Sequence, residues 1–123
     1  MGKKVYLAIP YSHPERAVRL ERFELANRKA AELINQGYIV FSPISMSHPM
    51  CEVADLPGDW AYWEKFDKAF LEFVDELYVV MADGWTESVG VNAEIEIMQG
   101  MGKPVRFLTC MEVSDAQSKS LMV

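Results

Sequence analysis

Cysteines are scarce in this chain: only Cys51 and Cys110 occur among its 123 residues. Two isolated cysteines provide neither a disulfide framework nor the paired spacing of a zinc site, so we expect no metal and a reducing compartment, the cytoplasm. Long apolar runs are also missing, and none approaches the roughly 20 residues of a membrane-spanning helix. Residues 1–4 lead directly into an apolar segment and lack the form of a signal peptide. We therefore expect no membrane partner.

Positive charge is outweighed by negative charge. Twelve lysines and arginines stand against 18 aspartates and glutamates, which gives a net charge of −6. A protein that binds nucleic acid needs a basic face, so this balance argues against a nucleic-acid partner. A small ligand held by a few local groups is compatible with it. Half of the residues are hydrophobic, enough for one packed domain, which we expect at 1–110 with a polar tail at 111–123.

Short apolar runs alternate with longer helical patterns along the chain. The runs are rich in β-branched and aromatic residues and predict strands at 4–9, 38–41, 77–81 and 104–108. Helices are predicted between the strands, because apolar residues recur there at helical spacing. This order predicts an α/β fold with a mainly parallel sheet of four to five strands.

The helix boundaries follow from capping residues. A helix is predicted to begin at residues 12–15, with Pro14 in its first turn, and to end at Gly37 in a left-handed cap. The next helix is predicted over residues 59–75. Residues 45–59 contain Pro49 and Pro57 and predict an irregular loop, a feature that is often functional in a compact domain.

The predicted sheet also predicts the place of a ligand. In open parallel sheets, ligands bind beyond the carboxyl ends of the strands, where the strand order reverses. This rule brings residues 10–13, 42–48 and 83–90 around one cleft.

The helix after Gly84 carries two acids that face opposite ways. At about 100° per residue, Glu94 falls on the apolar arc with Val91 and Met98, whereas Glu96 falls on the other side. An ionised carboxylate among apolar neighbours is costly unless it is paired or does chemistry. Glu94 is therefore either a catalytic group or a helix-edge acid bonded to a backbone amide.

Asp67 repeats this pattern on the preceding helix. It lies in the middle of an arc of aromatic and aliphatic residues. Two inward carboxylates on the helices that flank the third strand favour a functional reading. The structural alternative is that Asp67 pairs with Arg16, Arg19 or a backbone amide.

Ser88 lies where the glycine-bearing loop becomes a helix, beside Gly90. Free backbone N–H groups and the helix dipole at such a point favour a phosphate, with Arg16 or Arg19 on the first helix as possible cationic support. Ser88 is equally suited to be an ordinary N-cap, and the two roles are compatible.

Two histidines and two tryptophans are further candidates. His13 and His48 are predicted in loops on the cleft side, where each is either a ligand contact or a solvated side chain. Trp60 and Trp63 have the chemistry to stack on a base, although aromatic residues at helical spacing more often belong to the core.

Motifs spread over residues 4–108 carry a family resemblance. They are Tyr6-Leu7-Ala8, Asp67, Val89-Gly90-Val91-Asn92-Ala93-Glu94 and Gly102-Lys103-Pro104. With these motifs the chain resembles the nucleoside 2-deoxyribosyltransferase superfamily. Further motifs are similar to a small branch of it: Tyr11-Ser12-His13-Pro14, Ser47-His48-Pro49 and Pro57-Gly58-Asp59-Trp60.

The resemblance implies a flavodoxin-like three-layer sandwich, no cofactor and a site that a neighbouring subunit often completes, hence a homodimer or larger homo-oligomer. It implies that Glu94 is the nucleophile, that Asp67 handles the sugar and assists proton transfer, and that Tyr6 helps hold the nucleophile. The branch motifs add candidate substrate-binding residues, which together with Ser88 and Gly90 are Ser12, His13, His48, Asp59 and Trp60.

One departure from the superfamily favours one reaction over another. Transferases of this kind carry an Asp six residues before the nucleophile, where this chain has Ser88. The branch that hydrolyses (deoxy)nucleoside 5′-monophosphates has a Ser there, which binds phosphate. The resemblance therefore favours an N-glycosidase that cleaves the base–sugar bond of a nucleotide. Two alternatives stay open: a base-exchanging transferase and a nucleotide-binding or sensing module without turnover.

Overall fold

A computed structural model describes residues 2–110, and the tail expected at 111–123 lies outside them. Four strands form one sheet in the order β2-β1-β3-β4, and every neighbouring pair is parallel. The strands are β1 (Lys4–Ala8), β2 (Ile39–Phe41), β3 (Glu76–Val80) and β4 (Val105–Leu108). The helices are α1 (Arg16–Asn35), α2 (Pro43–Ala54), α3 (Trp60–Phe73), the short 3₁₀ turn η1 (Trp85–Glu87) and α4 (Val89–Gly100). The predicted α/β fold with a parallel sheet is confirmed.

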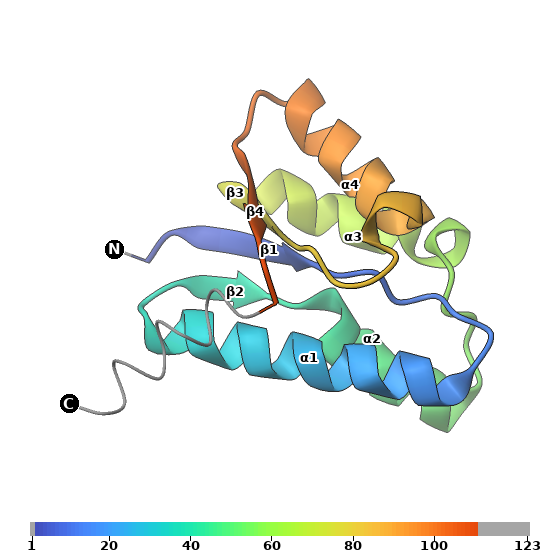
Figure 1. Cartoon of the computed structure of the whole chain (residues 1–123). Helices are drawn as coiled ribbons and strands as arrows, with labels where there is room; N and C mark the ends of the chain where they lie inside the picture. Colours follow the sequence, from blue (N-terminus) through green and yellow to red (C-terminus); the bar gives the residue numbers. More distant parts are fainter. Residues whose placement is uncertain (1, 111–123) are drawn as a thin grey trace.

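Helices cover both faces of the sheet and make it a flavodoxin-like three-layer sandwich (Figure 1). Side chains of β1 alternate between the two faces, as a strand's two-residue period requires. Val5 and Leu7 pack into a core with α1 and α2, whereas Tyr6 and Ala8 pack into a second core with α3 and α4. Because β1 and β3 are covered on both sides, they are apolar nearly throughout.

The strand order reverses between β1 and β3. The chain leaves β1 for β2 on one side, and the later strands build outward from β3 on the other. Loops that leave these two strands therefore diverge at their carboxyl ends and open a crevice. The α1–β2 connection turns at Gly37, whose φ of +104° is the left-handed conformation predicted for this cap.

The loop prediction for residues 45–59 is wrong in its first part, because α2 occupies residues 43–54. Pro43 is tolerated at the helix start, where its missing N–H would have no partner. Pro49 lies inside the helix and removes one internal hydrogen bond. Ile44 and His48, one turn apart, are both buried. The tertiary packing of this face therefore outweighs the local preference against helix.

The start predicted for the first helix also needs correction. α1 begins at Arg16 with Glu15 as its N-cap residue, so Pro14 precedes the helix. His13 folds back instead, and its Nδ1 accepts a hydrogen bond of 3.0 Å from the backbone N–H of Glu15. Residues 10–15 therefore form a loop after β1. Among residues 2–110, no helix is long and apolar enough to cross a membrane.

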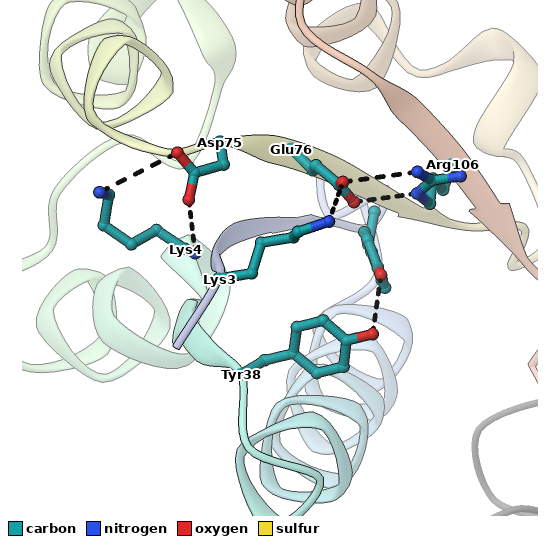
Figure 2. Close-up of polar contacts among 7 residues, drawn as sticks. Lys3, Lys4, Tyr38, Asp75, Glu76 and Arg106 are labelled. Atoms are coloured by element: carbon teal, nitrogen blue, oxygen red, sulfur yellow. Dashed lines mark hydrogen bonds and ion pairs between the residues drawn. The ribbon is translucent and has the colours of Figure 1, made fainter. Parts of the chain in front are cut away.

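The amino ends of the strands carry a compensated polar cluster (Figure 2). Glu76, only 3% exposed, accepts hydrogen bonds from Lys3 Nζ at 2.7 Å and from Arg106 Nε at 2.9 Å. These cations, Arg106 above all, keep the pKa of Glu76 below its ordinary value. Beside it, Asp75 accepts a hydrogen bond of 2.9 Å from the backbone N–H of Lys4. The charges at this end of the sheet are thus paired.

Lys103 joins the end of α4 to the end of α3. Its ammonium group donates to the carbonyls of Leu71, Glu72 and Val74 at 3.0, 2.6 and 2.7 Å. The last carbonyls of a helix have no partner within the helix, and a cation there also meets the negative end of the helix dipole.

We expect Lys103→Met to lower the free energy of unfolding by about 1–3 kcal/mol, because part-buried carbonyls lose their donor. Urea denaturation measures this loss. Lys68→Met is the matched control, since Lys68 is half-exposed and forms an ion pair with Glu64 at 3.8 Å, a surface contact worth less than about 1 kcal/mol. Equal losses in the two variants would contradict the capping role.

Candidate active site

Glu94 is placed by α4. The helix begins at its N-cap residue Ser88 and buries Val91, Glu94 and Met98 on the face toward the sheet. Glu94 is only 6% exposed, whereas Glu96 is exposed. The predicted opposite orientation of the two acids is confirmed.

Tyr6 reaches Glu94 from the sheet. Because β1 alternates, Tyr6 faces α3 and α4, and its side chain is fully buried. Its hydroxyl donates a hydrogen bond of 2.5 Å to Glu94 Oε2. Burial, together with the charges of Glu94 and Asp67, raises the pKa of Tyr6 well above its ordinary value. Tyr6 therefore stays a phenol and a hydrogen-bond donor.

Asp67 projects from α3 into the same region and is 7% exposed. It lines the same cavity as Glu94 and lies near enough to Tyr6 for its charge to raise the pKa of that phenol. Its structural alternative, an ion pair with Arg16 or Arg19, is wrong: Arg16 pairs with Glu52 at 2.6 Å and Arg19 donates to the His13 carbonyl.

The two carboxyl groups titrate unusually because they are buried. Burial is the main cause that raises the pKa of Glu94 to about 8. The hydrogen bond from Tyr6 lowers this pKa, and the nearby charge of Asp67 raises it further. Burial raises the pKa of Asp67 to about 6, against the hydrogen bond from Tyr6. Near neutral pH the pair therefore holds about one proton between its two carboxyls.

A cavity of about 600 Å³ opens above these groups, beyond the carboxyl ends of β1 and β3. It is a size typical of small-molecule sites. Most predicted site residues line it: Glu94, Asp67, Ser88, Gly90, Ser12, His13, Asp59 and Trp60. Trp63 lines it as well, so neither tryptophan is purely core. Tyr6 does not itself line the cavity. It lies beneath it and donates a hydrogen bond to Glu94, which does line it.

His48 is the predicted site residue that the structure places elsewhere. It belongs to α2 rather than to a loop, is 3% exposed and does not line the cavity. Its ring stacks on Phe23 at 4.4 Å, and its Nδ1 bonds the Tyr11 hydroxyl at 2.5 Å. Burial lowers the pKa of His48, which favours a neutral ring. His48 therefore supports Tyr11, which does line the cavity.

Ser88 is an N-cap, as one of its two predicted roles requires. Its Oγ accepts a hydrogen bond of 3.2 Å from the backbone N–H of Val91. The hydroxyl proton remains for a further acceptor, since a hydroxyl both accepts and donates. Asn92 supports the same turn, donating to the carbonyls of Thr86 and Ser88 at 2.9 Å each.

Sequence reasoning missed two residues of this site. The sequence indicates Tyr11 only as part of a motif, although its ring packs against Gly58 and lines the cavity. Arg22 also lines it and donates to the carbonyls of Ser12 and Asp83 at 3.1 and 3.0 Å. The sequence spacing of Arg22 does not distinguish it from the other arginines of α1. Its place at the cavity depends on where the two loops lie in the folded protein.

The donor set is that of acid–base and nucleophilic chemistry. Among residues 2–110, no three His, Cys, Asp or Glu side chains gather into a group that could hold a metal ion. Two buried carboxyls, one bonded to a phenol, are groups of the kind that act as nucleophile or charge stabiliser and as proton donor.

Comparisons with known proteins place the chain in a family whose description states no activity. No curated protein matches it. Residues 3–110, which include every residue of the site described above, match the model of a domain of unknown function, DUF1937. This chain of 123 residues therefore belongs to the DUF1937 family.

Proposed function

We propose that this protein is a cytoplasmic N-glycosidase that hydrolyses the base–sugar bond of a (deoxy)nucleoside 5′-monophosphate, with Glu94 as nucleophile. The observation that carries this proposal is the cluster of Tyr6, Glu94 and Asp67 at the floor of a ligand-sized cavity. The motif resemblance to the nucleoside 2-deoxyribosyltransferase superfamily supports it independently.

The proposed reaction uses the single proton of the carboxyl pair. The pKa values of about 8 and 6 place this proton mainly on Glu94, and in the reactive form it has moved to Asp67. The Glu94 carboxylate then attacks the anomeric carbon, and the bond to the base breaks with its electron pair leaving on the base. Asp67 protonates that base. Water then attacks the glycosyl ester, gives its proton to Asp67 and releases the sugar phosphate and the Glu94 carboxylate. Carboxylates stabilise the oxocarbenium-like character of such transition states.

Two further features support a phosphorylated substrate. Ser88 replaces an Asp of the transferases and so removes a negative charge from the start of α4. The backbone N–H groups and the positive end of the helix dipole at Ser88 and Gly90 favour an anion.

Large exposed side chains support the proposed homo-oligomer. Tyr62, Phe66 and Phe73 on α3 are 50, 39 and 61% exposed. Aromatic residues are enriched in protein interfaces.

Glu94→Gln is expected to abolish base release without unfolding the protein, because the amide has the same shape but is no nucleophile. Glu96→Gln is the matched control on the exposed face of α4 and should be nearly neutral. Chromatography of base released from a panel of nucleosides and nucleoside monophosphates measures this. Undiminished release by Glu94→Gln would reject the nucleophile assignment.

The same panel separates the alternatives. Base exchange between two nucleosides without net hydrolysis would identify a transferase. Ligand binding without any base release would identify a binding or sensing module.

The pH dependence of kcat/KM is expected to be bell-shaped. Below about 6 both carboxyls are protonated and the nucleophile is lost, whereas above about 8 both are ionised and the acid is lost. Asp67→Asn should reduce the rate by about a hundredfold or more and remove the alkaline fall, since only Glu94 then titrates. A profile that keeps both limbs in Asp67→Asn would exclude Asp67 as the proton donor.

Ser88 variants separate capping from phosphate binding. Ser88→Ala should lower kcat/KM for a monophosphate by about one to two orders of magnitude, the scale of a lost hydrogen bond to a charged group. Ser88→Asp keeps a good N-cap but adds a charge that repels phosphate, so it should retain thermal stability and lose monophosphate use. Unphosphorylated nucleosides should be little affected. A monophosphate-to-nucleoside ratio near one, unchanged by either variant, would favour the transferase.

A further inference from the structure

Arg22 connects the two loops of the switch point across the cavity. Its Nη1 donates to the carbonyl of Ser12, in the loop after β1, and its Nη2 to the carbonyl of Asp83, in the loop after β3. Gly84 lies beneath it with a φ of +86°, and a Cβ there would come within 3.1 Å of Nη2. The guanidinium thus occupies a fixed position in the cavity wall.

The charge of Arg22 is not neutralised by a carboxylate among residues 2–110, and its hydrogen bonds there go to the two carbonyls. Arg16 and Arg106, by contrast, pair with Glu52 and Glu76. Among the described residues that line the cavity, Arg22 is also the sole arginine or lysine. The acids there are Asp59, Asp67, Glu87 and Glu94. An anionic ligand would therefore meet one pre-positioned cation in an otherwise acidic cavity.

The hydrogen-bond capacity of Arg22 is only partly used. A guanidinium has five N–H donors in a rigid planar fork, and two of its nitrogens each donate one bond to a carbonyl. The remaining donors suit a planar or tetrahedral oxyanion, which arginine binds through paired N–H groups.

We propose that Arg22 determines specificity by binding the anionic group of the ligand, a phosphate monoester, and by holding the loops after β1 and β3 around it. Arg22 replaces Arg16 and Arg19 as the cation expected near the phosphate. This assignment rests on the proposed function for the identity of the substrate, but its binding step does not require turnover.

The experiment measures binding of ribose 5-phosphate, inorganic phosphate and ribose to the full chain by calorimetry. Arg22→Gln should weaken ribose 5-phosphate binding by about ten- to a hundredfold, the scale of lost charged hydrogen bonds, while Arg22→Lys should recover part of it. Arg28→Gln is the control, because Arg28 lies on the same helix, is exposed and lines no cavity described here. It should bind like wild type.

Each outcome bears on the proposal. Wild type that binds no ribose 5-phosphate, or Arg22→Gln that binds it equally well, overturns it. Loss of stability together with equal loss of ribose binding in Arg22→Gln and Arg22→Lys also overturns it, in favour of a loop-holding role alone. Arg22-dependent binding of ribose 5-phosphate without base release from any nucleotide supports Arg22 and rejects the glycosidase. Base release from monophosphates that is unchanged in Arg22→Gln supports the glycosidase and rejects the role of Arg22.

Discussion

The hydrogen bond from Tyr6 to Glu94 joins β1 to α4 between two buried side chains. A buried carboxyl group has lost its hydrogen bonds to water, and the hydrogen bond from the phenol replaces only part of them. Sliding or rotation of α4 along the sheet would break this bond, so the contact fixes where the Glu94 carboxyl lies relative to β1. The alternation of β1, with Tyr6 on one face and Val5 and Leu7 on the other, is what brings the phenol there.

The two ends of the sheet treat buried acids in opposite ways. At the amino ends of the strands, Glu76 has two cations within hydrogen-bond distance and its pKa is lowered (Figure 2). At the carboxyl ends, Glu94 has one neutral donor, the phenol of Tyr6, and burial raises the pKa values of Glu94 and Asp67 to about 8 and 6. The acid at the amino ends is paired with cations, whereas the two acids of the cavity have pKa values close to neutral pH. This contrast supports a chemical rather than a structural role for the pair.

The α/β architecture and the inward direction of Glu94 were predictable, because each follows from a repeating pattern in the sequence. The helix at α2 was not, since two prolines argue locally against it and only the packing of Ile44 and His48 decides for it. His48 could not be separated from a cleft residue for the same reason. The place of Arg22 depends on where two distant loops meet, which no local spacing encodes. The sequence thus predicts features that repeat within one helix or strand, but not contacts between distant loops.

Lys103 follows directly on α4 yet closes the end of α3. The two helices that carry Glu94 and Asp67 are therefore tied together at the end farthest from the cavity, while at the cavity end they contribute separate walls. At the cavity end the two helices also meet, since a Cβ on Gly90 of α4 would lie 3.8 Å from the Trp60 ring of α3. The spacing of the two carboxyls is therefore held from both ends of the helix pair.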